Sequence, residues 1–246
     1  MNVENVIRDK HTGDNEQLDF IFSDEARMIV TAPAGCGKTT AMVSKIAREL
    51  CSGSISSNKK VLAMTYSVNA AIRIKESVKN LLPEIVSNPV VLLKKVDIAN
   101  YHNFAMKLLH KYGYALNNEL INLNDFQIMD EKSIIRQGLL TTSEEYEFDK
   151  LEDALLSFKN QDLSECLNSY WNILNNKLIN QKVITYNGIL VAAIQLLSIE
   201  SISHFYSSYY KMIIIDEFQD TNLLGYLLVD KLVSNNKVIF LGDNIQ

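Results

Sequence analysis

A short stretch near the N-terminus has the residues and spacing of a phosphate-binding turn. The apolar run 28–31 leads into Ala-Pro-Ala-Gly-Cys-Gly-Lys-Thr-Thr at 32–40. Gly35 and Gly37 would let the backbone turn its N–H groups onto phosphate oxygens, and a helix that starts there adds its positive N-terminal end. Ala32 stands where the strict GxxxxGK[ST] pattern has its first glycine.

The residues that close this stretch suit a nucleotide and its metal ion. Lys38 can reach the β- and γ-phosphates, and the Thr39 hydroxyl can ligate Mg²⁺. The alternative is a strand–turn–helix that contains Gly-Lys-Thr by chance, but the strand before it and the helix after it favour the phosphate site. Cys36 lies in the turn near a helix N-terminus, where its thiol is either acidified and reactive or an inert small residue.

Two carboxylates follow an apolar run at 212–216. Asp216 and Glu217 lie at the end of that run, and open α/β sheets bind ligands at the carboxyl edge of their strands. Asp216 is placed to hold Mg²⁺ through water, and Glu217 is placed to accept a proton from the attacking water. The alternative is a strand that ends in a charged turn, which the phosphate-binding turn upstream makes less favourable.

The last apolar run, 238–243, is expected to end at the same edge of the sheet. It closes with Asp243, and Gln246 follows. Gln246 could hydrogen-bond a γ-phosphate or the attacking water and so report the state of the nucleotide to a moving element. The alternative for Gln246 is a polar loop residue.

The elements that must position these residues can be read from hydrophobic periodicity. Continuous apolar, β-branched runs predict strands buried in a parallel sheet, and amphipathic patterns between them predict helices. The expected strands are 28–31, 61–65, 96–100, 212–216 and 238–243, and Val90–Leu93 could extend the third. The expected helices are 39–50, 69–82, 101–113, 187–197 and 223–232. This alternation predicts an α/β core built of right-handed crossovers.

The middle of the chain has a different composition. Residues 114–182 are rich in Asn, Leu, Glu and Lys, with successive amphipathic helical patterns and no convincing strand. We therefore expect a helical insertion at 114–182 in a nucleotide-binding domain formed by 1–113 and 183–246.

Composition excludes several classes of protein. The 246 residues, 47% hydrophobic and 22% charged, are typical of a globular chain that holds one large domain with an insertion. No apolar run approaches the ~18 residues of a membrane span, and the polar N-terminus is not a signal peptide. Three scattered cysteines without metal spacing indicate a reducing, cytoplasmic setting. A net charge of −5 means that any nucleic-acid contact must come from local sites.

Taken in order, the motifs resemble those of the N-terminal half of UvrD/Rep/PcrA-like superfamily 1 DNA helicases. The family's AxxGxGKT motif carries alanine where Ala32 stands, and DEFQDTN is the most specific match. The resembling segments are NEQLDFI (15–21), APAGCGKTT (32–40), VLAMTYSVNAA (61–71), NYHNFA (100–105), IIIDEFQDTN (213–222) and FLGDNIQ (240–246).

The resemblance implies a fold and a set of site residues. The fold is a RecA-like P-loop parallel sheet flanked by helices, with 114–182 as an all-helical inserted subdomain. ATP and Mg²⁺ are the implied cofactors. The implied catalytic residues are Glu217, Lys38 and Gln246, and the metal residues are Thr39 and Asp216. Gln17 would read the adenine edge, and the implied nucleotide-binding residues are Gln17, Ala34, Gly35, Cys36, Gly37, Lys38, Thr39 and Thr40.

The resemblance also implies contacts with DNA, on segments where this chain departs from the family. Val68 and Asn69 replace the Asn and Lys of TFTNKAA, and the acidic-aromatic segment expected before motif II is TYNGIL at 185–190, without its acids. The implied DNA-binding residues are Thr65, Tyr66, Ser67, Tyr101, His102 and Asn103.

Elementary chemistry allows two interpretations of the DNA face. Aromatic rings stack bases, and hydroxyl, amide and basic groups bind phosphates, as Tyr66, Tyr101 and the basic helix residues Arg73, Lys75 and Lys79 could do. The alternative is that the tyrosines cap the core and the basic residues form a solvated face. Trp171, among apolar neighbours on an amphipathic helix, is expected in the core of the insertion and not at a DNA platform.

Two classes of function agree with these residues. The first is ATP-driven movement on single-stranded or junction DNA by a cytoplasmic ATP-dependent helicase. In the resembling family a second RecA-like domain supplies arginines to the transferred phosphate, so we expect these 246 residues alone to have little or no activity. The second is an ATP- and DNA-sensing regulatory subunit of a nuclease complex, for example in antiphage defence, without processive unwinding.

Overall fold

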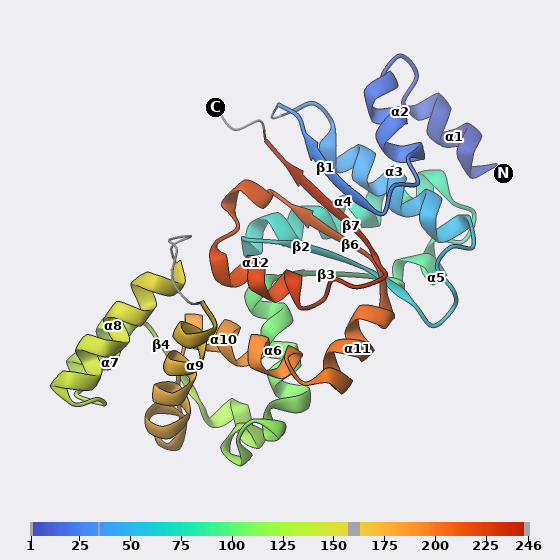
Figure 1. The fold of residues 1–246 in the computed structure, drawn as a ribbon. Helices are drawn as coiled ribbons and strands as arrows, with labels where there is room; N and C mark the ends of the chain where they lie inside the picture. The colour runs from blue at the N-terminus through green and yellow to red at the C-terminus, as the bar shows by residue number, and fades with distance from the viewer. Residues whose placement is uncertain (1, 34, 157–162, 244–246) are drawn as a thin grey trace. The chain divides into compact units, whose positions relative to one another are not determined.

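The computed structural model describes residues 2–33, 35–156 and 163–243, and its main feature is a five-stranded parallel sheet. The strand order is β1-β7-β6-β2-β3, and every paired neighbour runs parallel (Figure 1). All five predicted apolar runs are strands of this sheet. Their bounds are β1 (Arg27–Thr31), β2 (Lys60–Thr65), β3 (Val96–Asn100), β6 (Tyr210–Asp216) and β7 (Lys237–Gly242).

The register of the sheet brings the carboxyl ends of the strands together. The last residue of β1, Thr31, pairs with Gly242 of β7. Thr65 at the end of β2 pairs with both Asp216 of β6 and Asn100 of β3. One edge of the sheet therefore presents the residues that follow every strand, which is where parallel sheets place their ligands.

Helices from the N-terminal part of the chain cover one face of this sheet. Their bounds are α1 (Val3–Lys10), α2 (Asn15–Phe22), α3 (Lys38–Cys51), α4 (Val68–Ile85) and α5 (Pro89–Leu93). Buried residues of α1 to α4, among them Met42, Ile46 and Ile74, pack in one cluster with Val61 and Ile214 of the strands. This cluster fixes the start of α3 against the carboxyl edge of the sheet.

A buried lysine joins α2 to α3. Lys45 of α3 is fully buried, and its ammonium donates to the carbonyl oxygens of Ile21, at 3.1 Å, and Ser23. It also lies 3.3 Å from Glu49, which in turn pairs with Lys237 of β7 at 2.8 Å. Because a buried charge must be paired and hydrogen-bonded, this network restricts how α2 can lie on α3.

Contacts divide the chain into two compact units. Unit 1 comprises 1–100, 205–221 and 233–246, and unit 2 comprises 101–204 and 222–232. The sheet with α1 to α5 belongs to unit 1. Helix α11 (Glu200–Tyr209) crosses the boundary. The division into 1–113 with 183–246 and an insertion at 114–182 rests on motifs, and it stays a prediction.

Unit 2 is mostly helical. Helix α10 packs against α6, α9 and α12, and α8 packs against α9. The bounds are α6 (Tyr101–Tyr112), α7 (Glu131–Gln137), α8 (Thr142–Leu156), α9 (Leu163–Ile173), α10 (Tyr186–Leu197) and α12 (Leu223–Asp230). Short 3₁₀ or π segments are Gly113–Ala115, Asn118–Asp125, Leu174–Leu178 and Ile179–Gln181 here, and Phe218–Asp220 in unit 1.

A buried polar network lies inside unit 2. The Tyr170 hydroxyl donates to Glu152 and lies 2.6 Å from the Thr185 hydroxyl, which accepts from the backbone N–H of Gly188. The Asn187 amide donates to the other oxygen of Glu152. Burial, with a smaller contribution from the charge of Glu131, raises the pKa of Glu152 to about 7 against these hydrogen bonds.

Three details differ from the sequence-based expectation. Val90–Leu93 does not extend a strand, because Pro89 starts helix α5 there and both valines are exposed. Residues 114–182 contain one strand, β4 (Gln127–Met129), which pairs in parallel with β5 (Val183–Thr185). Three-residue strands are too short to give a periodic pattern. Trp171 is half-buried, and its neighbour Tyr170 takes the fully buried position.

No single helix among the described residues has both the length and the apolarity to cross a membrane. Helices α10 and α11, which are bent relative to one another, meet that test only when taken as a pair.

Candidate nucleotide-binding site

The turn between β1 and α3 has the backbone of a phosphate cradle. Gly35 and Gly37 adopt φ of +83° and +80°, which only glycine takes up without strain. Gly37 is the N-cap of α3 and offers no side chain, and the first turn of α3 has no acidic residue. The first N–H groups of α3 and its positive end are therefore open to an anion. Ala34 lies outside the described residues.

Lys38 is held close to this turn. Its ammonium donates to the carbonyl oxygens of Ala32, at 2.9 Å, and Pro33, at 3.3 Å, and it pairs with Asp243 after β7. Burial alone would lower the pKa of Lys38, but the hydrogen bond and charge of Asp243 outweigh it, so the pKa is raised. Lys38 is thus fully charged at neutral pH and carries a carboxylate partner beside the turn.

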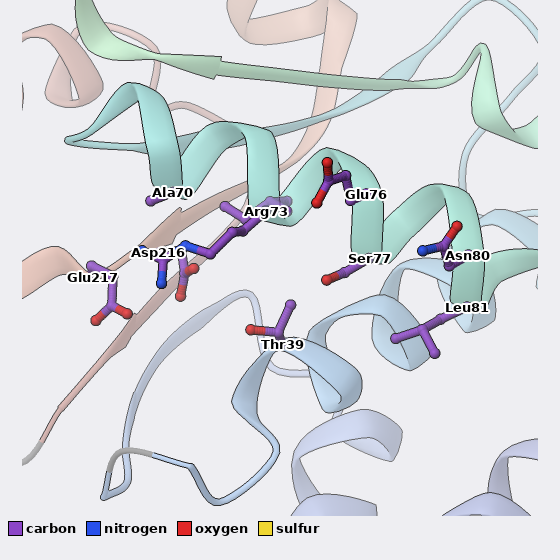
Figure 2. Close-up of a pocket in the computed structure, with 10 residues that line it drawn as sticks. Thr39, Ala70, Arg73, Glu76, Ser77, Asn80, Leu81, Asp216 and Glu217 are labelled. Carbon is purple, nitrogen blue, oxygen red and sulfur yellow. The ribbon is translucent and has the colours of Figure 1, made fainter.

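A cavity of about 430 Å³ brings the predicted metal residues together. Figure 2 shows Thr39 of α3 across from Asp216 and Glu217, with Arg73 of α4 reaching toward Asp216. Asp216 is buried at the end of β6. Burial, and then the charge of Glu217, raise its pKa to about 6, and Lys38 and Arg73 oppose this rise. Two crowded carboxylates beside a hydroxyl favour a cation between them and Thr39.

Glu217 is set at an unusual backbone angle. Its φ is +53°, one of two positive values outside glycine in the described chain. Its carboxylate accepts from the Gln219 amide at 2.7 Å, and Gln219 Oε1 accepts the backbone N–H of Asp243 at 3.1 Å. Gly242 permits this approach, since a Cβ there would lie 2.6 Å from Gln219 Oε1. The segment 217–219 is thereby tied to the segment that follows β7.

A second cavity, of about 220 Å³, adjoins the turn and shares no lining residue with the first. Gln17 of α2 lines it and donates from its amide to the carbonyl oxygen of Cys36 at 3.0 Å. Phe20 and Pro33 line the same cavity. Cys36 is exposed, and its thiol donates to the carbonyl of Pro33 at 2.7 Å. Thr40 is half-buried in the first turn of α3.

The predicted DNA-binding residues of unit 1 differ in exposure. Thr65 is fully buried, and its hydroxyl has no partner among the described residues. Tyr66 is 47% exposed. The Ser67 hydroxyl caps α4 by accepting from the N–H of Ala70 at 3.0 Å.

Those of unit 2 lie at the start of α6. Tyr101 is buried, and Asn103 is exposed. The His102 ring lies edge-on to the Tyr186 ring at 6.2 Å, and burial lowers the pKa of His102. The DNA roles of these six residues stay predictions, and Gln246 lies outside the described residues.

The structure adds four residues that sequence reasoning did not assign to the nucleotide site. Arg73 was expected near DNA, yet it lines the cavity with Thr39 and Asp216. Gln219 lies in the recognised DEFQDTN segment, so its position could have been inferred. His11 contacts Gln17, and Ser44 contacts His11, but neither residue carries a sequence signal because a buried histidine and serine look like core residues.

The donor set of the first cavity fits a nucleotide with Mg²⁺. A hydroxyl and carboxylates are the oxygen ligands that Mg²⁺ takes, usually with phosphate oxygens and water. No cluster of three or more His, Cys, Asp or Glu residues that could hold a metal occurs in the described part of the chain. The parallel sheet, the glycine turn and the carboxylates at one edge define a P-loop nucleotide-binding domain of the RecA-like kind.

Comparison with known proteins identifies the family. The UvrD/REP helicase N-terminal domain matches residues 14–246, so the chain belongs to that family. A probable DNA helicase II homolog of Mycoplasma genitalium is 28% identical over 94% of this chain and 35% of its own length. ATP-dependent DNA helicase PcrA of Staphylococcus aureus is 24% identical over 94% of this chain and 33% of its own length. The chain thus spans about a third of these relatives.

Proposed function

We propose that this chain is the ATP-binding part of a DNA helicase or translocase that couples ATP hydrolysis to movement on single-stranded or junction DNA. The observation that carries the proposal is the meeting of Lys38, Thr39, Asp216 and Glu217 beside one glycine turn at the carboxyl edge of the sheet. The relatives bear helicase names, which supports the motor and gives no support to a regulatory subunit of a nuclease.

Each site residue has a task that its position supports. Lys38 would leave Asp243 and bind the β- and γ-phosphates, while the open N–H groups of α3 hold the phosphate oxygens. Thr39 and Asp216 would hold Mg²⁺, which when bound neutralises charge on the phosphates. Glu217, oriented by Gln219, would accept the proton of the attacking water.

Movement on DNA requires more than this site. In the resembling family a second RecA-like domain completes the cleft, and we propose such a domain as the partner of unit 1. The greater length of the relatives supports it. Tyr66 is exposed directly after β2 and would stack a base. It follows Thr65, which pairs with Asp216 in the sheet. A cytoplasmic setting belongs to the same proposal.

Binding of a fluorescent ATP analogue with Mg²⁺ to the 246-residue chain tests the site. Lys38→Ala should weaken binding at least tenfold, because charge-assisted hydrogen bonds to phosphate are lost. Glu217→Gln should leave binding within about threefold, because its task comes after binding. Equal binding of the analogue by the wild type and by Lys38→Ala would contradict the assignment of the nucleotide site. Single-strand-stimulated ATPase, with Lys38→Ala as the control, then tests the motor, and we expect little turnover from this chain alone.

A further inference from the structure

A hydrogen-bonded relay of three side chains runs from α3 to the glycine turn. His11, directly after α1, is buried and contacts two partners with its ring nitrogens. Its Nε2 lies 2.8 Å from the Ser44 hydroxyl, and its Nδ1 lies 2.6 Å from Gln17 Oε1. Gln17 Nε2 then donates to the Cys36 carbonyl oxygen at 3.0 Å. The relay therefore ends on the backbone of the phosphate-binding turn.

The chemistry of the partners gives this relay one direction. The Cys36 carbonyl can only accept, so the Gln17 amide must turn its NH₂ group toward Cys36 and its oxygen toward His11. His11 Nδ1 must then carry a proton, and in the neutral ring Nε2 accepts from the Ser44 hydroxyl. A reversed Gln17 amide would place its oxygen against the Cys36 oxygen, which repels it.

The relay leaves Gln17 with one free donor and one free acceptor. An amide NH₂ offers two hydrogens and an amide oxygen two lone pairs, and Cys36 and His11 use one of each. The free pair matches the N7 acceptor and the N6 amino group of adenine. Guanine carries an acceptor, O6, in place of that amino group, so it would set two oxygens against each other.

The position of Gln17 is also fixed sterically. A Cβ on Gly37 would lie 2.9 Å from Gln17 Nε2, so the amide rests directly on the turn. Gln17 lines the cavity of about 220 Å³ beside Phe20, and that cavity shares no lining residue with the cavity at Asp216. A base in that cavity would meet the edge of the Gln17 amide.

We propose that His11 is a positioning residue that sets the preference of this site for adenine by holding the amide of Gln17 in one orientation. The inference rests on the proposed function and on the expectation that Gln17 reads the base of a bound nucleotide. Ser44 supports His11 from α3 by hydrogen bonding to Nε2, while the Gln17 oxygen decides that Nδ1 carries the proton.

Two substitutions at one position separate this role from packing. His11→Phe keeps a planar ring but removes the donor to Gln17, whereas His11→Asn keeps an N–H donor close to the position of Nδ1. The 246-residue chain and both variants are titrated with fluorescent ATP, fluorescent GTP and inorganic tripolyphosphate. The readout is the ratio of the ATP and GTP dissociation constants, because a fold defect alone would weaken both nucleotides together.

We expect the wild type to prefer ATP, His11→Phe to lose about tenfold of that preference, and His11→Asn to keep it within about threefold. Tripolyphosphate binding should be the same in all three proteins. An unchanged ratio in His11→Phe, or no preference in the wild type, overturns the role of His11 and leaves the phosphate site standing. Failure of the wild type to bind either nucleotide or tripolyphosphate overturns the proposed function itself. If His11→Phe does not fold, Ser44→Ala is expected to reduce the preference less than tenfold, and an unchanged ratio in that variant overturns the inference.

Discussion

Gly37 is required both by its positive φ and by the close approach of Gln17, whereas Gly53 is required only by its positive φ. Gly37 and Gly53 have φ of +80° and +81°, but a Cβ would touch Gln17 only at Gly37 and meets nothing within 4 Å at Gly53. Gly53→Ala should therefore lower the free energy of unfolding by about 1 kcal/mol, the strain of a left-handed residue. Gly37→Ala should lower the free energy of unfolding by about 1 kcal/mol more than Gly53→Ala does, because it also displaces the hydrogen-bonded Gln17 amide. It should also weaken ATP binding.

Urea unfolding followed by circular dichroism gives both free energies, and a fluorescent ATP analogue gives the affinities. The comparison isolates the contact with Gln17, because the backbone strain is common to the two variants. Equal destabilisation together with equal ATP affinity would show that Gln17 does not lie on the turn.

Asp243 competes with phosphate for Lys38. Lys38 pairs with Asp243, so a triphosphate that binds Lys38 must displace a carboxylate and also approach its negative charge. Asp243→Asn should raise the affinity for ATP about threefold, a modest gain because Asp243 is more than a third exposed. Asp97→Asn, which removes a carboxylate paired with Lys60, is the control and should leave the affinity unchanged. Weaker ATP binding by Asp243→Asn would mean that Asp243 supports the nucleotide.

At the scale of the element, the strands of the sheet could be predicted because continuous apolar runs are what a doubly buried parallel strand requires. The run before Asp216 placed that residue correctly at the carboxyl edge. Val90–Leu93 has the same composition, yet Pro89 and exposure make it helix α5. Strands β4 and β5 could not be found, because their pairing is a tertiary contact between two three-residue segments.

The buried network of α8, α9 and β5 predicts how the stability of unit 2 depends on pH. The folded pKa of Glu152, about 7, lies above its ordinary value of 4.5, so the folded state holds this proton more tightly than the unfolded state. The resulting stabilisation is complete below pH 4.5 and is lost as the pH rises through 7. The free energy of unfolding of Glu152→Gln, which mimics the protonated acid, should rise relative to that of the wild type by about 2.5 kcal/mol between pH 5 and pH 8.

Fluorescence of Trp171, the single tryptophan, reports the unfolding of this unit because it adjoins Tyr170 on α9. Glu144→Gln is a matched control. Hydrogen bonds from Lys177 and Thr141 lower the pKa of Glu144 to about 2, so the stability that its ionised form contributes is lost only in acid. The difference between Glu144→Gln and the wild type should be constant from pH 5 to pH 8. If the difference in free energy of unfolding between Glu152→Gln and the wild type were also constant over this pH range, the folded state would not hold a proton on Glu152.

At the scale of the whole molecule, the ordered motifs predicted the family and the elements that carry the candidate site, because each motif is a local strand end or turn. The contacts around Gln17 could not be predicted, because the tertiary fold brings Ser44 to His11 across 33 residues of chain and His11 in turn contacts Gln17. Arg73 was placed correctly on a helix, but only packing decides that this exposed side chain lines the cavity with Asp216. Local patterns therefore predicted the strand ends and the glycine turn better than the contacts between distant segments.

Because the net charge is −5, binding of single-stranded DNA must depend on local contacts, and the exposed ring of Tyr66 tests this. Tyr66 and Tyr226 are both 47% exposed, but only Tyr66 follows a strand at the carboxyl edge of the sheet. Because base–aromatic stacking contributes about 1–3 kcal/mol, Tyr66→Ala should weaken binding of a thymidine oligonucleotide about tenfold, with an unchanged salt dependence. Tyr226→Ala should bind as the wild type does. Fluorescence anisotropy at several salt concentrations measures both, and equal losses in the two variants would place the DNA away from β2.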